Sequence, residues 1–306
     1  MNRILVIRGG AIGDFVLTLP AIKLLRDRFP NAHLAILGYV HIAALAHRRF
    51  YANAIRSIEE GALAPLFSMD SDLDGGLVEY FGSFDLIVSY LSDRDGTFEN
   101  NLKRCSVKRL IIGPPKPAGA EHAAVQLARP LEQLGLHLTD PAAVLFPTNE
   151  DRELARQICR NAALVFHPGS GSETKNWPIE NWERLGDHFL SVGRELIVVS
   201  GEADEDRVRH LKLAWKGKPV RFTKSLALPA LAALCENATF IGHDSGISHI
   251  AAAVGARCFL LFGPSDPTVW APANRGVTVI RAPEGELRLL GVETVIARVM
   301  DCAGKA

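Results

Sequence analysis

The stretch from 242 to 255 concentrates the side chains of this chain that could do chemistry. Asp244 and Ser245 follow the apolar run 238–241 and precede a run of small residues that is typical of a helix. Both are favoured helix N-cap residues, and a helix start presents free amides and the positive end of a dipole to an anion. His249 shares the first turn with Ser245 because the two are four residues apart. The pattern favours a ligand that is phosphorylated and hydroxylated, although caps and a structural histidine would account for it too.

A second turn with reactive side chains spans residues 9–14 and ends on Asp14. Its glycines allow close approach of a ligand or a neighbouring backbone. The turn lacks the third glycine of a dinucleotide fingerprint, and the next predicted strand, 34–37, is not followed by an acidic residue. A nicotinamide-dependent dehydrogenase is therefore disfavoured. Asp14 is either a helix N-cap or a general base that accepts a proton from a substrate hydroxyl.

A third turn, 167–177, combines glycines and hydroxyl side chains with Lys175. It is not a Walker loop, but small hydroxyl residues and one lysine suit a diphosphate. A plain polar loop is the alternative. Four acids, Glu202, Asp204, Glu205 and Asp206, follow a strand predicted to end at Ser200. A carboxylate there can bind ribose hydroxyls, or the four can simply form a solvated helix start.

Strands and helices alternate along the chain. The apolar runs predict strands at 3–7, 34–37, 84–89, 108–112, 163–166, 195–200, 238–241 and 257–262. Helices are predicted at 15–29, 42–46, 122–134, 152–161, 179–192, 228–235 and 292–300. The alternation indicates an α/β protein with parallel, doubly wound sheets. We expect two Rossmann-like domains, 1–148 and 149–306, joined by a linker within 141–150 and facing an interdomain cleft.

The amino-acid composition argues against several classes of protein. The 306 residues are 48% hydrophobic, and 34 Lys and Arg balance 34 Asp and Glu, so a general nucleic-acid binder is disfavoured. Five widely spaced cysteines argue against a disulfide framework or a zinc site and fit a reducing cytoplasm. The longest apolar stretch, 34–46, is shorter than the roughly 20 residues of a membrane span, which leaves only peripheral membrane contact open. A basic run between 103 and 116 is either a solvated face or a surface for an acidic, phosphorylated acceptor.

Four motifs occur in one order along the chain. They are the stretch from Arg8 to Pro20, His167-Pro-Gly-Ser continuing to Lys175-Asn-Trp-Pro178, Asp244-Ser-Gly-Ile-Ser-His249, and Phe262-Gly-Pro264. Together they closely resemble glycosyltransferase family 9, the bacterial ADP-heptose:lipopolysaccharide heptosyltransferases. The resemblance covers residues 1–40 and about 160–300, and the stretch from 40 to 150 carries nothing diagnostic.

The resemblance implies a GT-B fold and an inverting reaction without a metal. It places a nucleotide-diphosphate heptose, ADP-heptose in that family, as co-substrate in the C-terminal domain, with no other cofactor. Asp14 is then the candidate base, and Lys175 stabilises the diphosphate leaving group. The implied donor-binding residues are Gly13, Ser170, Gly171, Ser172, Glu205, Asp244, Ser245, Gly246 and His249. Glu202 competes with Glu205 for the nucleotide, and His243 is a departure that leaves donor preference open.

The resulting expectation is a cytoplasmic glycosyltransferase that adds a heptose-type sugar to a lipopolysaccharide core or related glycolipid. Its partners are the nucleotide-sugar donor and the glycolipid acceptor, with no nucleic acid and no obligate protein partner. The acceptor-binding residues stay unknown. A nucleotide-sugar epimerase and a non-catalytic sugar-binding protein of the same fold are the alternatives; the presence of Asp14, Lys175 and His249 together favours the enzyme.

Overall fold

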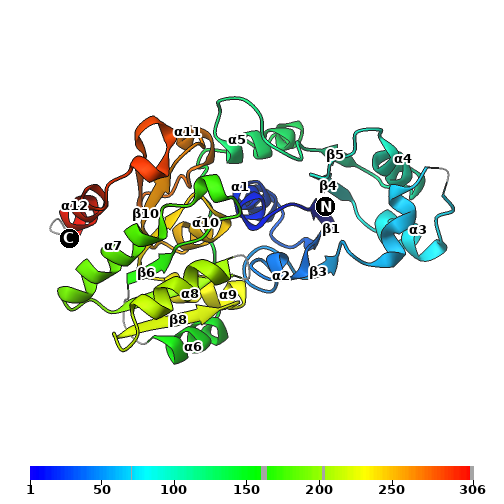
Figure 1. The fold of residues 1–306 in the computed structure, drawn as a ribbon. Coiled ribbons are helices and arrows are strands. Elements are labelled where there is room, and N and C mark those ends of the chain that lie inside the picture. The colour runs from blue at the N-terminus through cyan, green and yellow to red at the C-terminus, as the bar shows by residue number, and fades with distance from the viewer. Residues whose placement is uncertain (70, 160–163, 202–203, 304–306) are drawn as a thin grey trace. The chain divides into compact units, whose positions relative to one another are not determined.

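The computed structural model describes residues 1–69, 71–159, 164–201 and 204–303. Its contacts divide the chain into two compact units, Met1–Pro141 and Ala142–Ala306. Figure 1 colours the first unit from blue to green and the second from green to red. The predicted linker, 141–150, contains this division, whereas the predicted domain boundary lies seven residues further along.

The first unit is built on a five-stranded parallel sheet. Its strands are β1 (Arg3–Arg8), β2 (His33–Gly38), β3 (Ala54–Ser57), β4 (Leu86–Ser89) and β5 (Leu110–Ile112), in the order β3-β2-β1-β4-β5. The run Arg3–Arg8 is apolar except at its ends and buried from Ile4 onward, as a central parallel strand must be. Because β1 pairs with both β2 and β4, the strand order reverses between β1 and β4.

Helices cover the first sheet. They are α1 (Ile12–Arg28), α2 (Val40–Ala43), η1 (Gly61–Phe67), α3 (Gly75–Gly82), α4 (Thr97–Arg104), α5 (Ala123–Ala128) and η2 (Arg129–Leu134). Leu66, Phe81 and Leu102, from η1, α3 and α4, join strand residues in one buried cluster. Helix α1 begins three residues before the predicted start and runs through Pro20. Asp14 is therefore inside its first turn, and the interpretation of Asp14 as the N-cap residue was wrong.

The second unit is built on a six-stranded parallel sheet. Its strands are β6 (Leu164–His167), β7 (Leu196–Ser200), β8 (Val220–Lys224), β9 (Thr239–His243), β10 (Arg257–Phe262) and β11 (Val277–Arg281), in the order β11-β10-β9-β6-β7-β8. The order reverses between β6 and β9, where His167 is in register with Gly242. All pairings in both sheets are parallel among the described strands, which confirms the predicted class.

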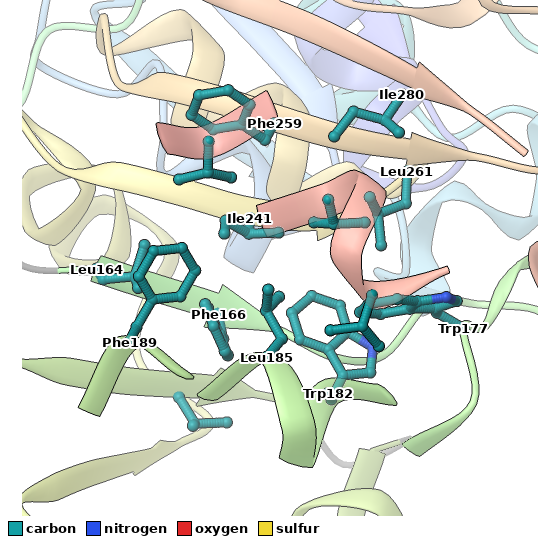
Figure 2. Packing of buried hydrophobic residues seen from close by; sticks show 14 of the residues in the cluster. Leu164, Phe166, Trp177, Trp182, Leu185, Phe189, Ile241, Phe259, Leu261 and Ile280 are labelled. Carbon is teal, nitrogen blue, oxygen red and sulfur yellow. The ribbon is translucent and has the colours of Figure 1, made fainter. Parts of the chain in front are cut away.

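Both faces of the second sheet are covered, so it is doubly wound. The helices are α6 (Asn149–Ile158), η3 (Glu173–Lys175), α7 (Ile179–Ser191), α8 (Glu205–Ala214), α9 (Leu228–Cys235), α10 (Gly246–Ala253), α11 (Pro267–Trp270), η5 (Pro283–Gly285), η6 (Leu287–Leu289) and α12 (Val292–Ala303). Side chains of α7, α8 and α12 fill one core, and Figure 2 shows Trp182 and Leu185 of α7 beside strand residues such as Phe166. Side chains of α6, α9 and α10 fill the core on the other face.

Helix α10 is more deeply buried than its sequence pattern predicts. One buried stripe through Ile247, Ala251 and Val254 was expected. Instead every residue from Ser248 to Ala253 is buried, whereas Ile247 and Val254 are only partly so. The small side chains of the helix explain the difference, because they allow neighbouring elements to approach it closely on several sides.

The chain enters the second unit along an extended entry segment, residues 142–148. Leu145 N–H donates to the carbonyl of Ala253 at the end of α10 (2.9 Å), and the Asn274 amide donates to the carbonyl of Ala143 (2.8 Å). Thr148 then caps α6 by exchanging side-chain and backbone hydrogen bonds with Asp151. The predicted helix 152–161 thus starts three residues earlier, and its last two residues lie outside the described part of the chain.

The predicted basic run is exposed, and two of its lysines face carboxylates. Lys103 pairs with Glu99 (2.7 Å) and Lys108 with Asp85 (2.6 Å), and both lysine side chains are more than half exposed. This arrangement favours the solvated-face interpretation. Among the described residues, no helix is long and apolar enough to cross a membrane.

Candidate functional site

The strand order reverses once in each sheet, and the predicted site residues follow those strands. In open α/β sheets, ligands bind outside the carboxyl ends of the strands at such a reversal. In the first unit, β1 leads through a short turn into α1, whose first turn carries Asp14. In the second unit, β6 leads into the loop that carries Lys175, and β9 leads into Asp244 and Ser245. Each unit therefore has a candidate site of its own.

Asp14 is held in a fixed orientation at the start of α1. Its Oδ2 accepts a hydrogen bond from the backbone N–H of Ala11 (2.9 Å), which satisfies one free amide of the helix start. Its side chain is 31% exposed, so the carboxylate can still be reached. Gly13 directly precedes it in the helix. Gly10, at φ +90°, leaves no room for a side chain, since a Cβ there would lie 2.7 Å from Asp14 Oδ2.

Arg8, which sequence reasoning did not select, is buried beside this aspartate. Its guanidinium donates to the carbonyls of Pro115 (2.9 Å) and Asp14 (3.3 Å), and Nη2 lies 3.7 Å from Asp14 Oδ1. Burial lowers the pKa of Arg8, and the nearby carboxylate of Asp14 opposes that shift. An arginine remains charged in any case, so Arg8 supplies a positive charge next to the candidate base. The signals in the sequence were its position at the end of a buried strand and at the start of the motif that runs from Arg8 to Pro20.

In the second unit, two residues predicted to bind the donor form an ion pair. Lys175 Nζ lies 2.5 Å from Asp244 Oδ2, with the lysine side chain 34% and the aspartate side chain 10% exposed. The pair joins η3 to the turn after β9, although the two residues are 69 positions apart in the chain. The lysine charge is thereby held at the carboxyl edge of the sheet, where it can be shared with a second anion.

Helix α10 starts at the predicted position, directly after Asp244 and Ser245. Ser245 is the N-cap residue, and its Oγ accepts from the backbone N–H of Ser248 (3.4 Å). Gly246 is the first helical residue, and His249 lies in the first turn, 5% exposed. Asp244 does not cap the helix in the described contacts; its carboxylate faces Lys175 instead.

The loop after β6 is held by hydrogen bonds between its own hydroxyl groups and backbone. Ser170 Oγ donates to the carbonyl of Ser172 (2.8 Å) and accepts from its N–H (3.3 Å), and Ser172 Oγ lies 3.0 Å from Thr174 Oγ1. A Cβ on Gly171 would meet nothing within 4 Å. The loop therefore presents a small, open surface of hydroxyls and backbone.

The acids that follow β7 differ in their exposure, whereas a common role was expected for them, either ribose binding or a solvated helix start. Glu205 is exposed and pairs with Lys224, whereas Asp204 is buried and accepts from the N–H of Gly201 (3.0 Å). Burial alone would raise the pKa of Asp204, but hydrogen bonding to His167, with the charge of Arg207, lowers it overall. Glu202 lies outside the described residues, and Glu205 stays the candidate for the nucleotide.

His243, which the sequence marked only as a departure from the family, anchors the loop. It is fully buried, and its Nε2 accepts from the backbone N–H of Trp177 (2.9 Å). The Trp177 indole in turn donates to the carbonyl of Leu290 (2.9 Å). Burial lowers the pKa of His243 to about 3, so the ring is neutral near pH 7. The loop that carries Lys175 is thus fastened to the core directly behind it.

Comparisons with known proteins place this arrangement in a class and then in a family. The two parallel α/β sheets, together with the matching solved structures of heptosyltransferases, give the GT-B fold of glycosyltransferases. The chain belongs to glycosyltransferase family 9 (heptosyltransferase), whose family model matches residues 120–296. The predicted family and fold are confirmed, and the protein is a glycosyltransferase. In the described residues, no cluster of three or more His, Cys, Asp or Glu could hold a metal ion.

Similarity to individual relatives extends over the whole chain. The chain is 23% identical, over an alignment of 331 residues, to lipopolysaccharide heptosyltransferase 1 of Escherichia coli O18:K1:H7, and the alignment covers 99% of each chain. The glycosyl transferase family 9 structure from Veillonella parvula DSM 2008 matches with a TM-score of 0.83 at 19% identity, covering 100% of this chain and 98% of that one. E. coli heptosyltransferase WaaC with ADP-2-deoxy-2-fluoro heptose matches with a TM-score of 0.70 at 19% identity, covering 98% and 99%.

Proposed function

We propose that this enzyme transfers a heptose-type sugar, with inversion and without a metal ion, from a nucleotide-diphosphate donor to a lipopolysaccharide core or related glycolipid. ADP-heptose is the proposed donor, because a family relative of the same fold was crystallised with ADP-2-deoxy-2-fluoro heptose. The names of the relatives support the acceptor class. The observation that carries the proposal is the Lys175–Asp244 pair next to the start of α10.

In the second unit, the donor diphosphate would bind at the start of α10. Free amides at Gly246 and beyond, together with the positive end of the helix dipole, favour an anion there. Lys175 supplies a positive charge for the leaving diphosphate, which is where charge develops during transfer. A lysine and a helix start together can do the work that a divalent ion does in other transferases, and this supports the metal-free mechanism.

In the first unit, Asp14 would act as the base. The acceptor hydroxyl gives its proton to the Asp14 carboxylate as its oxygen attacks the anomeric carbon from the face opposite the diphosphate. The bond from that carbon to the diphosphate oxygen breaks, and the nucleoside diphosphate leaves with the electron pair. Attack from the opposite face inverts the anomeric centre. The neighbouring Arg8 charge and the Ala11 N–H keep the carboxylate oriented for this step.

The reaction would take place in the cytoplasm. A glycolipid acceptor would bring the enzyme to the inner face of the inner membrane as a peripheral protein. No obligate protein partner is needed for the proposed chemistry.

Transfer from ADP-heptose to a heptose-free lipopolysaccharide precursor tests the function directly. Asp14→Ala should lower turnover by about 10²–10⁴-fold, because a positioned base contributes that much. Its affinity for ADP should be unchanged. Asp27→Asn is the matched control, since Asp27 lies on the same helix and pairs only with exposed Lys23 among the described contacts.

Other results would identify other functions. Near-normal turnover in Asp14→Ala would remove the base from the mechanism. A donor that is isomerised without any acceptor would indicate an epimerase. Donor binding without transfer or isomerisation would indicate a sugar-binding protein.

A further inference from the structure

We propose that Arg207 is a positioning residue of the donor site, which holds the loop 168–177 so that Lys175 stays beside the start of α10. The inference rests on the proposed function, because it presupposes that Lys175 and the start of α10 bind the donor diphosphate. It goes beyond that function by assigning a role to a side chain on another helix, α8, which acts through the backbone of the loop.

The two ends of the loop 168–177 are buried, whereas its middle is not. Every residue from 170 to 176 is at least partly exposed, and the buried ends consist of Pro168, Gly169 and Trp177. In the part of the chain that the structure describes, the hydrogen bonds of residues 170–176 stay within the loop, apart from the ion pair between Lys175 and Asp244. The position of Lys175 therefore depends on how the two ends of the loop are held.

Arg207 binds both ends of the loop at once. Its Nε donates to the carbonyl of Pro168 (2.8 Å), and its Nη2 donates to the carbonyl of Trp177. A guanidinium carries its N–H donors in one rigid plane, so a single side chain fixes the separation of the two carbonyls. A charged donor also forms a stronger hydrogen bond than a neutral one. Arg207 thus closes the loop at its base.

His243 provides a second connection between the same ends, and it is neutral. Its Nε2 accepts from the N–H of Trp177, so the ring hydrogen is on Nδ1, which lies 3.3 Å from the carbonyl oxygen of Gly169. This connection comes from β9, in the core behind the loop, whereas Arg207 comes from α8. Loss of Arg207 should therefore loosen the loop without releasing it.

Carboxylates balance the charge of Arg207. Burial lowers the pKa of Arg207, and the nearby carboxylates of Glu173 and Asp204 oppose that shift. An arginine remains charged in any case. Because these acids offset its charge, we expect Arg207 to affect a bound diphosphate through the position of the loop and not through direct attraction.

A loop that is already in place lowers the free-energy cost of binding. The ammonium of Lys175 ends a flexible side chain, so it serves the diphosphate only while its backbone stays close to the start of α10. Without Arg207 the loop would populate other positions, and ADP binding would have to order it again. The affinity for ADP should then fall, but by no more than it falls when Lys175 itself is removed.

A double-mutant cycle on ADP binding, measured by calorimetry, tests the inference. Arg207→Gln should weaken binding by about tenfold, which is the lower limit of the loss expected for Lys175→Ala. In a Lys175→Ala background, Arg207→Gln should change the affinity by no more than about twofold, because the lysine through which it acts is gone. Arg209→Gln is the matched control and should bind ADP like the wild type, since Arg209 is on the same helix but is exposed and pairs with Asp206 (3.1 Å).

A second variant separates the two-point contact from the charge. Arg207→Lys keeps the positive charge but lacks the rigid fork, so it should lose affinity as Arg207→Gln does. Wild-type affinity in Arg207→Lys, or an equal loss from Arg207→Gln with and without Lys175, would overturn the role of Arg207 while leaving the transferase intact. Failure of both variants to fold would overturn it too, because His243 still connects the ends of the loop. Failure of ADP to bind the wild type would overturn the donor proposal as well.

Discussion

Replacing Gly169 with alanine tests the packing that holds Asp204 at the candidate site. An alanine Cβ at this position would lie 1.6 Å from Asp204 Oδ1 and 2.1 Å from its Cγ. Neither distance is compatible with contact between non-bonded atoms, so the carboxylate must move. Both sides of the contact are buried, which leaves the carboxylate no solvated position within easy reach.

The expected loss of stability follows from the contacts that Asp204 would give up. Overpacking a filled site costs about 1–3 kcal/mol. Losing the hydrogen bond from the Gly201 N–H to a charged acceptor costs about 1.5–3 kcal/mol more. Gly169→Ala should therefore lower the free energy of unfolding by about 2.5–6 kcal/mol. Gly171→Ala, in the same loop, should change it by less than about 0.5 kcal/mol because its Cβ would meet nothing.

Urea unfolding followed by tryptophan fluorescence measures this loss in the relevant unit. All four tryptophans of the chain, at 177, 182, 215 and 270, belong to the second unit. The double variant Gly169→Ala/Asp204→Ala should be about as stable as Asp204→Ala alone, since the clash is gone. A coupling energy below about 0.5 kcal/mol would refute the packing argument, because residues in direct contact couple more strongly than that.

The remaining predictions concern the same unit. Lys175→Ala should weaken ADP binding by about 10–100-fold, as expected for the loss of a charged hydrogen bond. Asp244→Asn should weaken ADP binding less, because the lysine is still present. Equal losses of affinity in the two variants, measured by calorimetry, would contradict the charge role of Lys175. The neutral, buried His243 has a pKa of about 3 against an ordinary 6.5, so its contribution to stability is complete above pH 6.5 and is lost as the pH falls toward 3. Between pH 7 and pH 5 this amounts to about 2 kcal/mol, which urea unfolding should show in the wild type but not in His243→Gln. Transfer should persist in EDTA, and its abolition with restoration by a divalent ion would exclude the metal-free mechanism.

The central strands and their turns could be predicted from the sequence because they depend on local pattern. Runs such as 3–7 and 257–262 are apolar throughout, and each leads to a turn of small or capping residues. The edge strands β3, β8 and β11 were not predicted. Each has only four or five residues, mixes polar with apolar side chains and is partly exposed, so no continuous apolar run marks any of them.

The buried part of the site could not be predicted for a different reason. Nothing local distinguishes Asp204 from Glu205, which follows it in a row of acids. Asp204 is buried because Gly169, 35 residues earlier, leaves space for its carboxylate and His167 lies across from it. The start of α1 was misplaced because Ala11 offers no capping side chain; the useful signal was the acid three residues later, whose carboxylate binds the Ala11 N–H.

The contacts of the entry segment, 142–148, decide where the chain can be cut if the second unit is to be produced separately. Leu145 satisfies the carbonyl of Ala253, the last residue of the helix whose other end is the candidate diphosphate site. A fragment beginning at Asn149 would keep every strand of the second sheet but lose that hydrogen bond and the cap that Thr148 gives to α6. A fragment that contains the second unit alone should therefore begin at Ala142. A protease cut within 142–148 would remove the contact that supports the C-terminal end of α10.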